Sequence, residues 1–468
     1  MPRAISKQGG TLSLPRPMAS HRLLAMFNGY IEGMDMKRIA VFALAALVFA
    51  PVVVVHAAEE ENAWTRFRGP NGSGISGAEA IPIKWTAEEY NWTVKLPGDG
   101  SSSPVAWKEN LFVTCNDRKK SIRSIVCVNA ANGKTNWRRG FPYTSYRVHR
   151  DNDFASATPA VDAAGVVVAW SLPRQLLMLA LDLEGKELWR RDLGPYVGIH
   201  GSASSPIIVD GLVILANDQM HPEVMKRHLP KGASMVPGES FLIAVDRMSG
   251  KTRWKIDRRT VLAGYSTPCV RQAGGGAREL VFSGTAHGMT GVDLATGKLN
   301  WEIKGILNSR VVGSPQLYQD LVFGSYGSGL SAQQLVAVQA PRKGGVKEPK
   351  VAYKVSQSPP LVPSCLIKDD LLFLWTDSGI VSCLDAATGK RHWRERVGGS
   401  YYCSPVWIDG RLYCTSKAGA VVVISADKTF KLLAKNPLGE KCFATPAVAN
   451  GVMYQRTQTK LFSLGGKK

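Results

Sequence analysis

The sequence predicts an all-β fold: an eight-bladed β-propeller of four-stranded antiparallel blades, closed by pairing of its N- and C-terminal strands. Three observations predict it. A Gly-Lys-x-x-Trp string recurs five times, a Ser/Thr-Pro string recurs seven times, and no long segment has helical periodicity. The 468 residues are 45% hydrophobic and 20% charged, as in globular proteins, which excludes wholesale disorder and a multi-span membrane protein.

The Gly-Lys-x-x-Trp string marks the turn before the last strand of a unit. Its tryptophans are Trp137, Trp189, Trp254, Trp301 and Trp393. An Asp or Asn three or four residues before each glycine opens the turn, and the glycine supplies its left-handed position. Chance would give on the order of 0.1 matches at this composition, so the string is a genuine repeat.

The Ser/Thr-Pro string sets the phase of the units. It precedes an apolar stretch at Pro104, Pro159, Pro206, Pro268, Pro315, Pro405 and Pro446. The longest interval holds a degenerate copy in which the order is inverted, as Pro363-Ser364. The spacing therefore predicts eight units of four strands, each of roughly 40 to 50 residues, which is the size of a propeller blade.

The eighth unit ends without a Gly-Lys-x-x-Trp string, so it lacks its outer strand. Residues Tyr90–Leu96 precede the first unit and belong to none, and they are the expected donor of that strand. Trp92 then joins the five repeat tryptophans in a blade-docking role. Because closure leaves no free sheet edge at the seam, we expect one monomeric ring. Units five and seven lack the tryptophan turn and carry Gln339–Pro341 and Ala426–Lys428 there.

The N-terminal region predicts export. Residues 36–57 combine a basic start, the apolar run Ile39–Val55 and a small-residue exit, which is typical of a cleaved signal peptide, with a signal anchor as the alternative. Met36 is well placed as an initiator, so we expect residues 1–35 to be a start-site artefact or a disordered leader. Residues 58–84 form an N-terminal extension before the propeller at 85–468. No cysteine follows the apolar run, so we expect an unlipidated periplasmic or secreted protein.

The net charge of +21 is carried largely by turns. The basic stretches are Arg118–Lys120, Arg253–Arg259, Arg342–Lys350 and Arg391–Arg396. They would attract an anionic surface, an acidic polysaccharide or an acidic partner, or they form a solvated rim; both interpretations stay open. Nucleic-acid binding is not expected of an exported chain without a recognition fold.

No metal site, redox motif or catalytic residue is predicted. The eight cysteines are scattered without a C-x-x-C spacing, which favours burial in strands over a zinc or thioredoxin-type site. His221 and His228 lie in an inserted loop, Gln219–Ser240, where a solvated loop is favoured over a metal site. Gly274–Gly276 is expected to be a turn between strands rather than a phosphate-binding loop.

The loops that lead into the first strand of each blade should meet at one mouth of the central channel. Several carry unusual polar residues, which predict a small-molecule or peptide site. The candidate lining is His149, Asp153, His200, Tyr265, Arg310 and Tyr401. The alternative is a wet channel whose polar groups satisfy one another.

The repeat resembles that of pyrroloquinoline quinone (PQQ)-type propellers, most clearly at Val292–Trp301 and Cys383–Trp393. The resemblance covers about residues 64–468 and implies that each tryptophan docks between neighbouring blades. No Trp-Asp dipeptide is present, which argues against WD-repeat propellers. The stretch Trp64–Gly74 resembles the opening of BamB-like secreted bacterial proteins.

Two subfamilies of that kind have different functions. Quinoprotein alcohol dehydrogenases hold PQQ and calcium beneath a disulfide between adjacent cysteines, and this chain has no adjacent cysteines. BamB-like propellers bind partners and perform no chemistry. The resemblance therefore implies a non-catalytic scaffold with an envelope protein or another macromolecule as partner and no cofactor. A PQQ-dependent oxidoreductase and a carbohydrate-binding or carbohydrate-active propeller remain alternatives.

Overall fold

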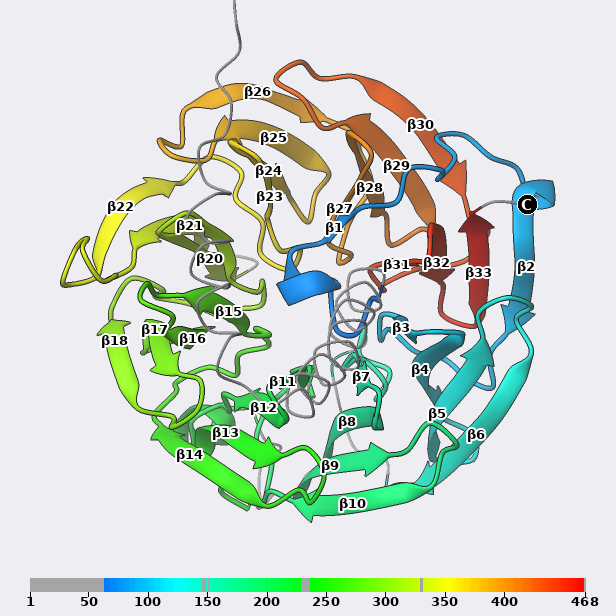
Figure 1. The fold of residues 1–468 in the computed structure, drawn as a ribbon, viewed down its shortest axis with the longest axis horizontal. Helices are drawn as coiled ribbons and strands as arrows, with labels where there is room; N and C mark the ends of the chain where they lie inside the picture. Colours follow the sequence, from blue (N-terminus) through cyan, green and yellow to red (C-terminus); the bar gives the residue numbers. More distant parts are fainter. Residues whose placement is uncertain are drawn as a thin grey trace, which may run out of the picture. The chain divides into compact units, whose positions relative to one another are not determined.

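The computed structural model describes residues 63–144, 149, 151–172, 174–201, 203–228, 236–328 and 331–466, all within the unit Glu61–Lys468. The predicted leader and signal peptide lie outside the described residues. Eight four-stranded antiparallel blades follow one another around a central axis, which confirms the predicted eight-bladed propeller (Figure 1). One blade gains a fifth, parallel strand from the N-terminal extension. No helix in the described ranges is long and apolar enough to cross a membrane.

Each of the first four blades is a meander whose first strand lies innermost and whose fourth lies at the rim (Figure 1). Blade 1 contains β3 (Val105–Trp107), β4 (Asn110–Asp117), β5 (Ile122–Asn129) and β6 (Thr135–Pro142). Blade 2 contains β7 (Ala160–Asp162), β8 (Gly165–Leu172), β9 (Gln175–Leu181) and β10 (Glu187–Asp192). Blade 3 contains β11 (Ile207–Val209), β12 (Leu212–Asn217), β13 (Ser240–Asp246) and β14 (Thr252–Arg258). Blade 4 contains β15 (Cys269–Gln272), β16 (Arg278–Gly284), β17 (Gly288–Asp293) and β18 (Leu299–Ile303).

The last four blades repeat this order, and the eighth closes the ring. Blade 5 contains β19 (Gln316–Tyr318), β20 (Leu321–Ser328), β21 (Ser331–Gln339) and β22 (Lys350–Val355). Blade 6 contains β23 (Leu366–Lys368), β24 (Leu371–Trp375), β25 (Ile380–Asp385) and β26 (Arg391–Arg396). Blade 7 contains β27 (Val406–Ile408), β28 (Arg411–Thr415), β29 (Ala420–Ser425) and β30 (Leu432–Pro437). Blade 8 contains β31 (Ala447–Ala449), β32 (Val452–Arg456), β33 (Lys460–Gly465) and, as its outer strand, β2 (Tyr90–Lys95). The antiparallel pairing of β2 with β33 confirms the predicted closure.

The apolar core is divided among the interfaces between blades. In β8, Val166 and Val168 pack against blade 1, whereas Val167 and Ala169 pack against blade 3. Successive side chains of a strand point to opposite faces, and here both faces are covered by a neighbouring blade. This two-sided burial explains why the inner strands are continuous apolar runs, as in Leu176–Leu181, instead of alternating apolar and polar residues.

The repeat tryptophan of one blade occupies the space above the turn glycine of the next. A Cβ on Gly250 would lie 2.7 Å from Cδ2 of Trp189, whose Nε1 donates a hydrogen bond to the Arg247 carbonyl at 2.8 Å. Gly250 also has a φ of +66°, so both its backbone and its missing side chain are needed. Equivalent indole–glycine contacts join Trp92 to Gly133, Trp137 to Gly185 and Trp254 to Gly297. On blade 7, which lacks the glycine turn, Trp393 donates to the Asp427 carbonyl at 2.8 Å.

Blade 5 departs from the tryptophan–glycine contact at its interfaces with both blade 4 and blade 6. Its own docking residue is Tyr353, which lies against Gly389 of blade 6 and donates its hydroxyl to the Ala386 carbonyl at 2.6 Å. Blade 5 offers no glycine turn to Trp301 of blade 4. The Nε1 of Trp301 donates instead to the Glu279 carboxylate of its own blade, at 2.9 Å. A tyrosine thus takes a role that the tryptophan string could not reveal.

The Ser/Thr-Pro string supplies a ring of hydrogen bonds around the channel. The backbone N–H of one Ser or Thr donates to the hydroxyl of its counterpart in the next blade. Six such bonds of 2.9 to 3.0 Å are present: Ser103 to Thr158, Thr158 to Ser205, Thr267 to Ser314, Ser314 to Ser364, Ser364 to Ser404, and Ser404 to Thr445. Ser364 is therefore in register, and Cys365 takes the place of proline. The degenerate copy predicted at Pro363-Ser364 is confirmed as the entry to blade 6, and its register is that of the serine, with Pro363 preceding the repeated position of the hydroxyl instead of following it.

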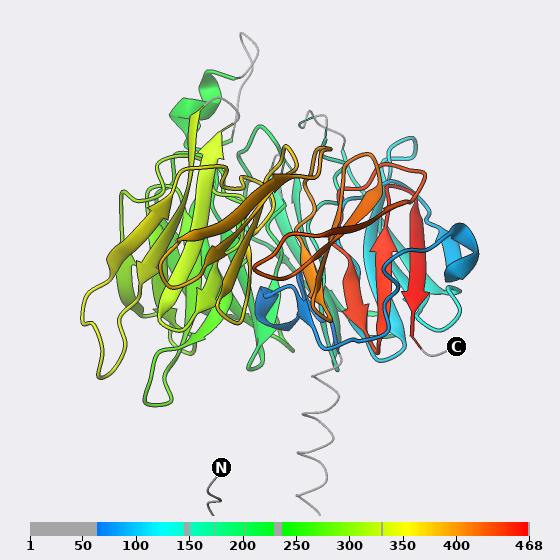
Figure 2. The same ribbon diagram turned by 90° about the horizontal axis from the view of Figure 1, so that it is seen from above.

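The N-terminal extension crosses one end of the channel. We call residues 63–76 the plug; it includes η1 (Pro70–Gly72) and β1 (Ile75–Ser76). Its backbone accepts hydrogen bonds from Ala106 of blade 1 and Val161 of blade 2, at 2.9 and 2.8 Å, and β1 pairs in parallel with β27 of blade 7. Figure 2 shows the plug on the face opposite α3 (Pro222–Lys226), a helix in the inserted loop.

Side chains of the plug reach further blades. Asn71 exchanges two hydrogen bonds of 2.8 Å with the backbone of Val270 in blade 4. Arg68 is fully buried and donates to the carbonyl of Cys365, at the entry to blade 6, at 2.9 Å. Burial lowers the pKa of the Arg68 guanidinium to about 10, which keeps it charged at neutral pH. The plug thereby ties together blades that are distant in the sequence.

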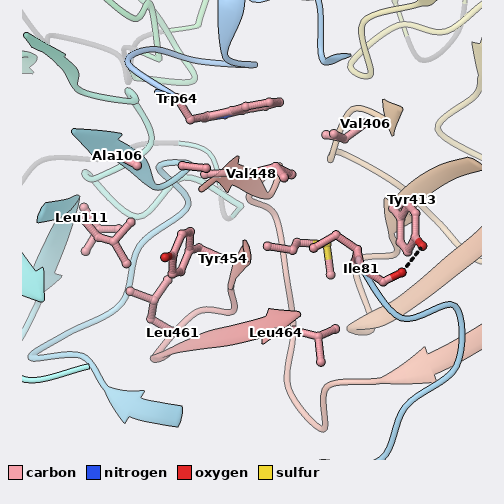
Figure 3. Packing of buried hydrophobic residues seen from close by; sticks show 14 of the residues in the cluster. Trp64, Ile81, Ala106, Leu111, Val406, Tyr413, Val448, Tyr454, Leu461 and Leu464 are labelled. Carbon is pink, nitrogen blue, oxygen red and sulfur yellow. Dashed lines mark hydrogen bonds between the residues drawn. The ribbon is translucent and has the colours of Figure 1, made fainter. Parts of the chain in front are cut away.

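Hydrophobic packing joins the extension to the seam of the ring. Trp64 lies beside Ala106 and Val448, within a cluster shared by blades 7, 8 and 1 (Figure 3). Further along, Ile81 packs in the same cluster, and its carbonyl accepts a hydrogen bond from the Tyr413 hydroxyl at 3.2 Å. The short helix η2 (Ala87–Glu89) then leads into β2.

The turn glycines give a direct test of the docking contact. Replacing Gly250 by alanine adds backbone strain and also displaces the Trp189 indole, whereas Gly211 has a φ of +71° but no neighbouring atom within 4 Å of the place a methyl group would take. We expect Gly211→Ala to cost about 1–2 kcal/mol of unfolding free energy, from strain alone. Gly250→Ala should cost about 1–3 kcal/mol more, from overpacking. Equal losses in urea denaturation would contradict the docking role.

Candidate functional site: the mouth of the channel

The channel contains two adjoining cavities. The mouth cavity, of about 610 Å³, is lined by loops that enter the first strands, and its lining includes His149, His200, Tyr265, Arg310, Asp377 and Tyr402. The inner cavity, of about 170 Å³, is lined by hydroxyl residues of the Ser/Thr ring and by Phe67 of the plug. Both cavities share Ala203, Tyr265 and Tyr402 in their walls. The mouth cavity is thus backed by the inner cavity and the plug.

Four of the six residues proposed from the sequence lie together in the mouth cavity: His149, His200, Tyr265 and Arg310. Each comes from a different loop between blades. The strands of a propeller point these loops toward one end of the axis, so residues up to about 160 positions apart become neighbours.

The other two candidates, Asp153 and Tyr401, are placed outside the mouth cavity. Asp153 is buried and accepts hydrogen bonds from Ser101 and from the backbone N–H of Ala155, so it shapes its own loop. Tyr401 packs edge-on against Trp375 between blades 6 and 7. Their neighbours Asp151 and Tyr402 line the cavity instead. Tyr401 and Tyr402 are adjacent, and adjacent residues of an extended chain face opposite sides, so sequence alone did not show which tyrosine faces the axis. Asp151 and Asp153 lie in an irregular loop without strand geometry, where no regular periodicity predicts which carboxylate faces the cavity.

Two histidines from neighbouring loops form one wall. The rings of His149 and His200 are 4.9 Å apart between centroids. The Asn152 side chain donates to the His200 carbonyl at 2.8 Å and so ties the two loops together. The Nδ1 of His149 accepts the N–H of Asp151 at 3.3 Å, which leaves its Nε2 as a donor. Burial lowers the pKa of His200 to about 4, assisted by the charge of Arg310, so its ring is neutral at pH 7.

The mouth cavity also contains an ion pair, which involves Asp151 of the same loop as His149. Lys417 donates to Asp151 at 3.0 Å, and the Tyr402 hydroxyl donates to the same carboxylate oxygen at 3.1 Å. The Lys417 ammonium also lies 4.0 Å from the centroid of the Tyr402 ring. Burial raises the pKa of Asp151, but the hydrogen bond and charge of Lys417 outweigh it and bring the pKa below its ordinary value. This carboxylate is therefore charged and already paired.

The second carboxylate in the lining, Asp377, accepts hydrogen bonds from the backbone. Asp377 accepts the N–H groups of Leu361 and Val362, at 2.8 and 3.2 Å, one with each oxygen. Burial raises its pKa, opposed by these hydrogen bonds. Asp377 therefore holds the loop between blades 5 and 6 in place.

Arg310, unlike Asp151 and Asp377, has a side chain that is not hydrogen-bonded to a described residue. Its backbone carbonyl accepts the N–H of Gly327 at 3.0 Å, which fixes its Cα against blade 5. Its guanidinium has no hydrogen-bond or ion-pair partner among the described residues, and its Nε is buried. The mouth cavity therefore contains the guanidinium of Arg310, which has no described partner, together with the imidazoles of His149 and His200. Tyr265 and Tyr402 supply aromatic surface. This set suits binding through hydrogen bonds and charge.

The histidine and cysteine residues considered as metal or redox sites lie outside the mouth cavity. The Nδ1 of His221 accepts the Glu223 N–H at 3.3 Å at the start of α3. All eight cysteines are buried and none is in a disulfide; Cys403 and Cys442 have their sulfurs 3.7 Å apart. Within the described ranges, no cluster of three or more His, Cys, Asp or Glu residues could hold a metal ion.

The depressed pKa of His200 can be measured. An NMR titration should show its imidazole protonating near pH 4, against an ordinary value of 6.5, with His200→Gln identifying the resonance. Between these two pH values the unfolded chain binds the proton and the folded chain does not. Folding stability should therefore fall as the pH is lowered through this window. Titration near 6.5 would show that the ring is exposed to solvent.

Known proteins share the fold and most of the repeat region. The family described as outer membrane protein assembly factor BamB matches residues 85–221, 121–394, 356–431 and 377–463. BamB from Moraxella catarrhalis is similar in structure, with a TM-score of 0.53 and 16% identity over 80% of this chain and 95% of that chain. No curated protein matches the sequence.

Two further solved structures have the same ring. Quinohemoprotein alcohol dehydrogenase ADHIIG from Pseudomonas putida HK5 has a TM-score of 0.51 and 13% identity, over 89% of this chain and 82% of that chain. The computationally designed Ika8 protein has a TM-score of 0.53 and 10% identity, over 79% of this chain and 98% of that chain. At these identities the likeness concerns the fold alone. The family match spans most of the propeller, so the chain belongs to the family described as outer membrane protein assembly factor BamB.

Proposed function

We propose that this protein is a non-catalytic binding scaffold of the periplasm or the exterior of the cell, which captures a partner macromolecule at the mouth of its channel. The observation that carries the proposal is the mouth cavity, whose volume of about 610 Å³ lies in the range of ligand sites. The family's description as an assembly factor and the predicted signal peptide at residues 36–57 support the role and the compartment.

The plug determines from which end of the channel a partner can enter. It hydrogen-bonds to the inner strands of several blades and supplies Phe67 to the wall of the inner cavity. A partner segment therefore enters the mouth cavity from the α3 face and ends within the channel. A loop or a chain end of the partner, inserted in this way, would be held by a few residues of the cavity, because a small number of contacts commonly supplies most of the binding energy of an interface.

The proposal gives PQQ no role, because the lining does not fit the donor set that a quinoprotein centre requires. Of the two described carboxylates that line the mouth cavity, Asp151 is paired with Lys417 and Asp377 accepts two backbone N–H groups, so neither is free to bind calcium. The resemblance to quinoprotein dehydrogenases also implies adjacent cysteines, and the sequence has none.

Filling the cavity tests the scaffold directly. Ala203 lies in the wall shared by both cavities, so Ala203→Trp should obstruct the channel. Pull-downs from the native envelope fraction should recover a partner with the wild-type protein and at least tenfold less of it with Ala203→Trp.

The matched control is Ala131→Trp, the same change at an exposed rim turn of blade 1. This variant should retain the partner at the wild-type level. Equal recovery of the partner with both variants would remove the channel mouth from the proposal, provided that both variants melt cooperatively.

Cofactor chemistry can be tested separately. Addition of PQQ and calcium to the purified protein should leave the PQQ absorbance spectrum unchanged, and no dye-linked alcohol oxidation should follow. Stoichiometric PQQ binding accompanied by turnover would replace the scaffold with an oxidoreductase.

A further inference from the structure

Arg310 differs from the well-buried arginines of the ring in having no partner among the described residues. Arg258, Arg271 and Arg247 each pair with a carboxylate, at 3.0 Å from Asp218, 2.6 Å from Glu279 and 2.7 Å from Asp162. Arg456 has no carboxylate but donates to two backbone carbonyls and a serine hydroxyl. Leaving a cation without an acceptor in a partly enclosed site is costly.

The surroundings of Arg310 supply further donors. Its charge is among the causes that lower the pKa of His200, so the two groups lie in each other's electrostatic field. His149 lies beside His200 and keeps its Nε2 free to donate, since its Nδ1 accepts from Asp151. A guanidinium fork flanked by imidazole donors matches a planar oxyanion, which accepts two parallel hydrogen bonds from arginine.

The charges of the lining decide which oxyanion fits. Asp151 and Asp377 also face the mouth cavity, and Lys417 balances only the first of them. His200 is neutral at pH 7. Among the described residues of the lining, Arg310 is the positive charge that has no hydrogen-bonded partner. A monoanion would pair with this charge, whereas a dianionic phosphate would bring a second negative charge close to the two carboxylates.

We propose that the mouth cavity is a carboxylate-binding site, in which Arg310, assisted by His149 and His200, holds an acidic side chain of the partner. This inference rests on the proposed function, which supplies a polypeptide as the occupant. A free carboxylic acid offers the same group, so the experiment distinguishes the two sources. The basic stretches of the rim have no part in the site. The prediction that they are turns is wrong for Arg391–Arg396, which forms β26, and for Arg253–Arg259, which falls almost wholly in β14.

The test uses the protein with isotope-labelled histidines and follows the His149 and His200 resonances by NMR. The probes are the blocked tripeptide acetyl-Gly-Glu-Gly-amide, its glutamine counterpart, and propionate. The glutamate peptide should shift both resonances in a saturable way, and the glutamine peptide should not. Saturation by propionate with equal affinity would assign the site to free carboxylates. An absence of shifts with both the glutamate peptide and propionate would overturn the proposal.

Substitutions locate the binding group. Arg310→Gln should weaken glutamate-peptide binding at least tenfold, and Arg310→Lys should restore part of it, because the charge returns without the fork. The matched control is Arg253→Gln, which removes an equal charge from an exposed position of β14 and should leave binding unchanged. Since the Arg310 guanidinium has no described partner, Arg310→Gln should keep the wild-type melting temperature. Unaltered peptide binding in folded Arg310→Gln would contradict the proposal.

The experiments distinguish a failure of the scaffold proposal from a failure of the carboxylate site. If Ala203→Trp loses the partner but Arg310→Gln binds the glutamate peptide normally, the scaffold stands and the carboxylate site is wrong. If Arg310→Gln abolishes peptide binding but Ala203→Trp retains the partner, the carboxylate site stands and capture of the partner at the channel mouth is wrong.

Discussion

The ring depends on one contact made repeatedly: an aromatic side chain of one blade fills the space that a glycine leaves in the next. Trp189 above Gly250 shows both requirements, because the glycine needs a positive φ and has no room for a Cβ. The contact lies at the outer edge of the interface, and the Ser/Thr hydroxyl bonds lie at the inner edge. Between them the apolar strands pack on both faces. Where both contacts are present, as between blades 1 and 2 and between blades 2 and 3, neighbouring blades are fixed to each other at two radii, which sets the width of the channel and the position of its loops.

The N-terminal plug gives this otherwise symmetric ring two different ends. Its contacts with blades 1, 2, 4, 6 and 7 close one end, so that the mouth cavity opens on the other. Closed rings of this kind place loops from distant parts of the chain around one opening. Four residues from four loops, His149, His200, Tyr265 and Arg310, meet there without any local sequence motif to connect them. In the proposed scaffold, the loops govern partner choice and the plug sets the direction of entry.

The sequence predicted the blade number, the strand order and the closure, because each blade repeats the same short-range chemistry. It predicted less where a role can be filled by another residue type. Tyr353 replaces tryptophan, and Ser364 keeps the hydroxyl register without the proline. In the site, the loops could be identified but the facing side chains could not. Asp151 and Tyr402 line the cavity in place of Asp153 and Tyr401, because these irregular loops have no periodicity from which the facing side chain could be predicted. The path of the plug was also missed, because it carries no repeat.

The central claim is that the partner enters the channel from the open mouth. Photo-cross-linking tests it most directly, with a photoreactive residue placed either at Ser400, which lines the mouth cavity, or at Gly77, an exposed position just after β1 with open space around it. After capture of the partner from the native envelope fraction, Ser400 should cross-link to it and Gly77 should not. Cross-linking from Gly77 alone would place the binding surface on the plugged face and contradict this account.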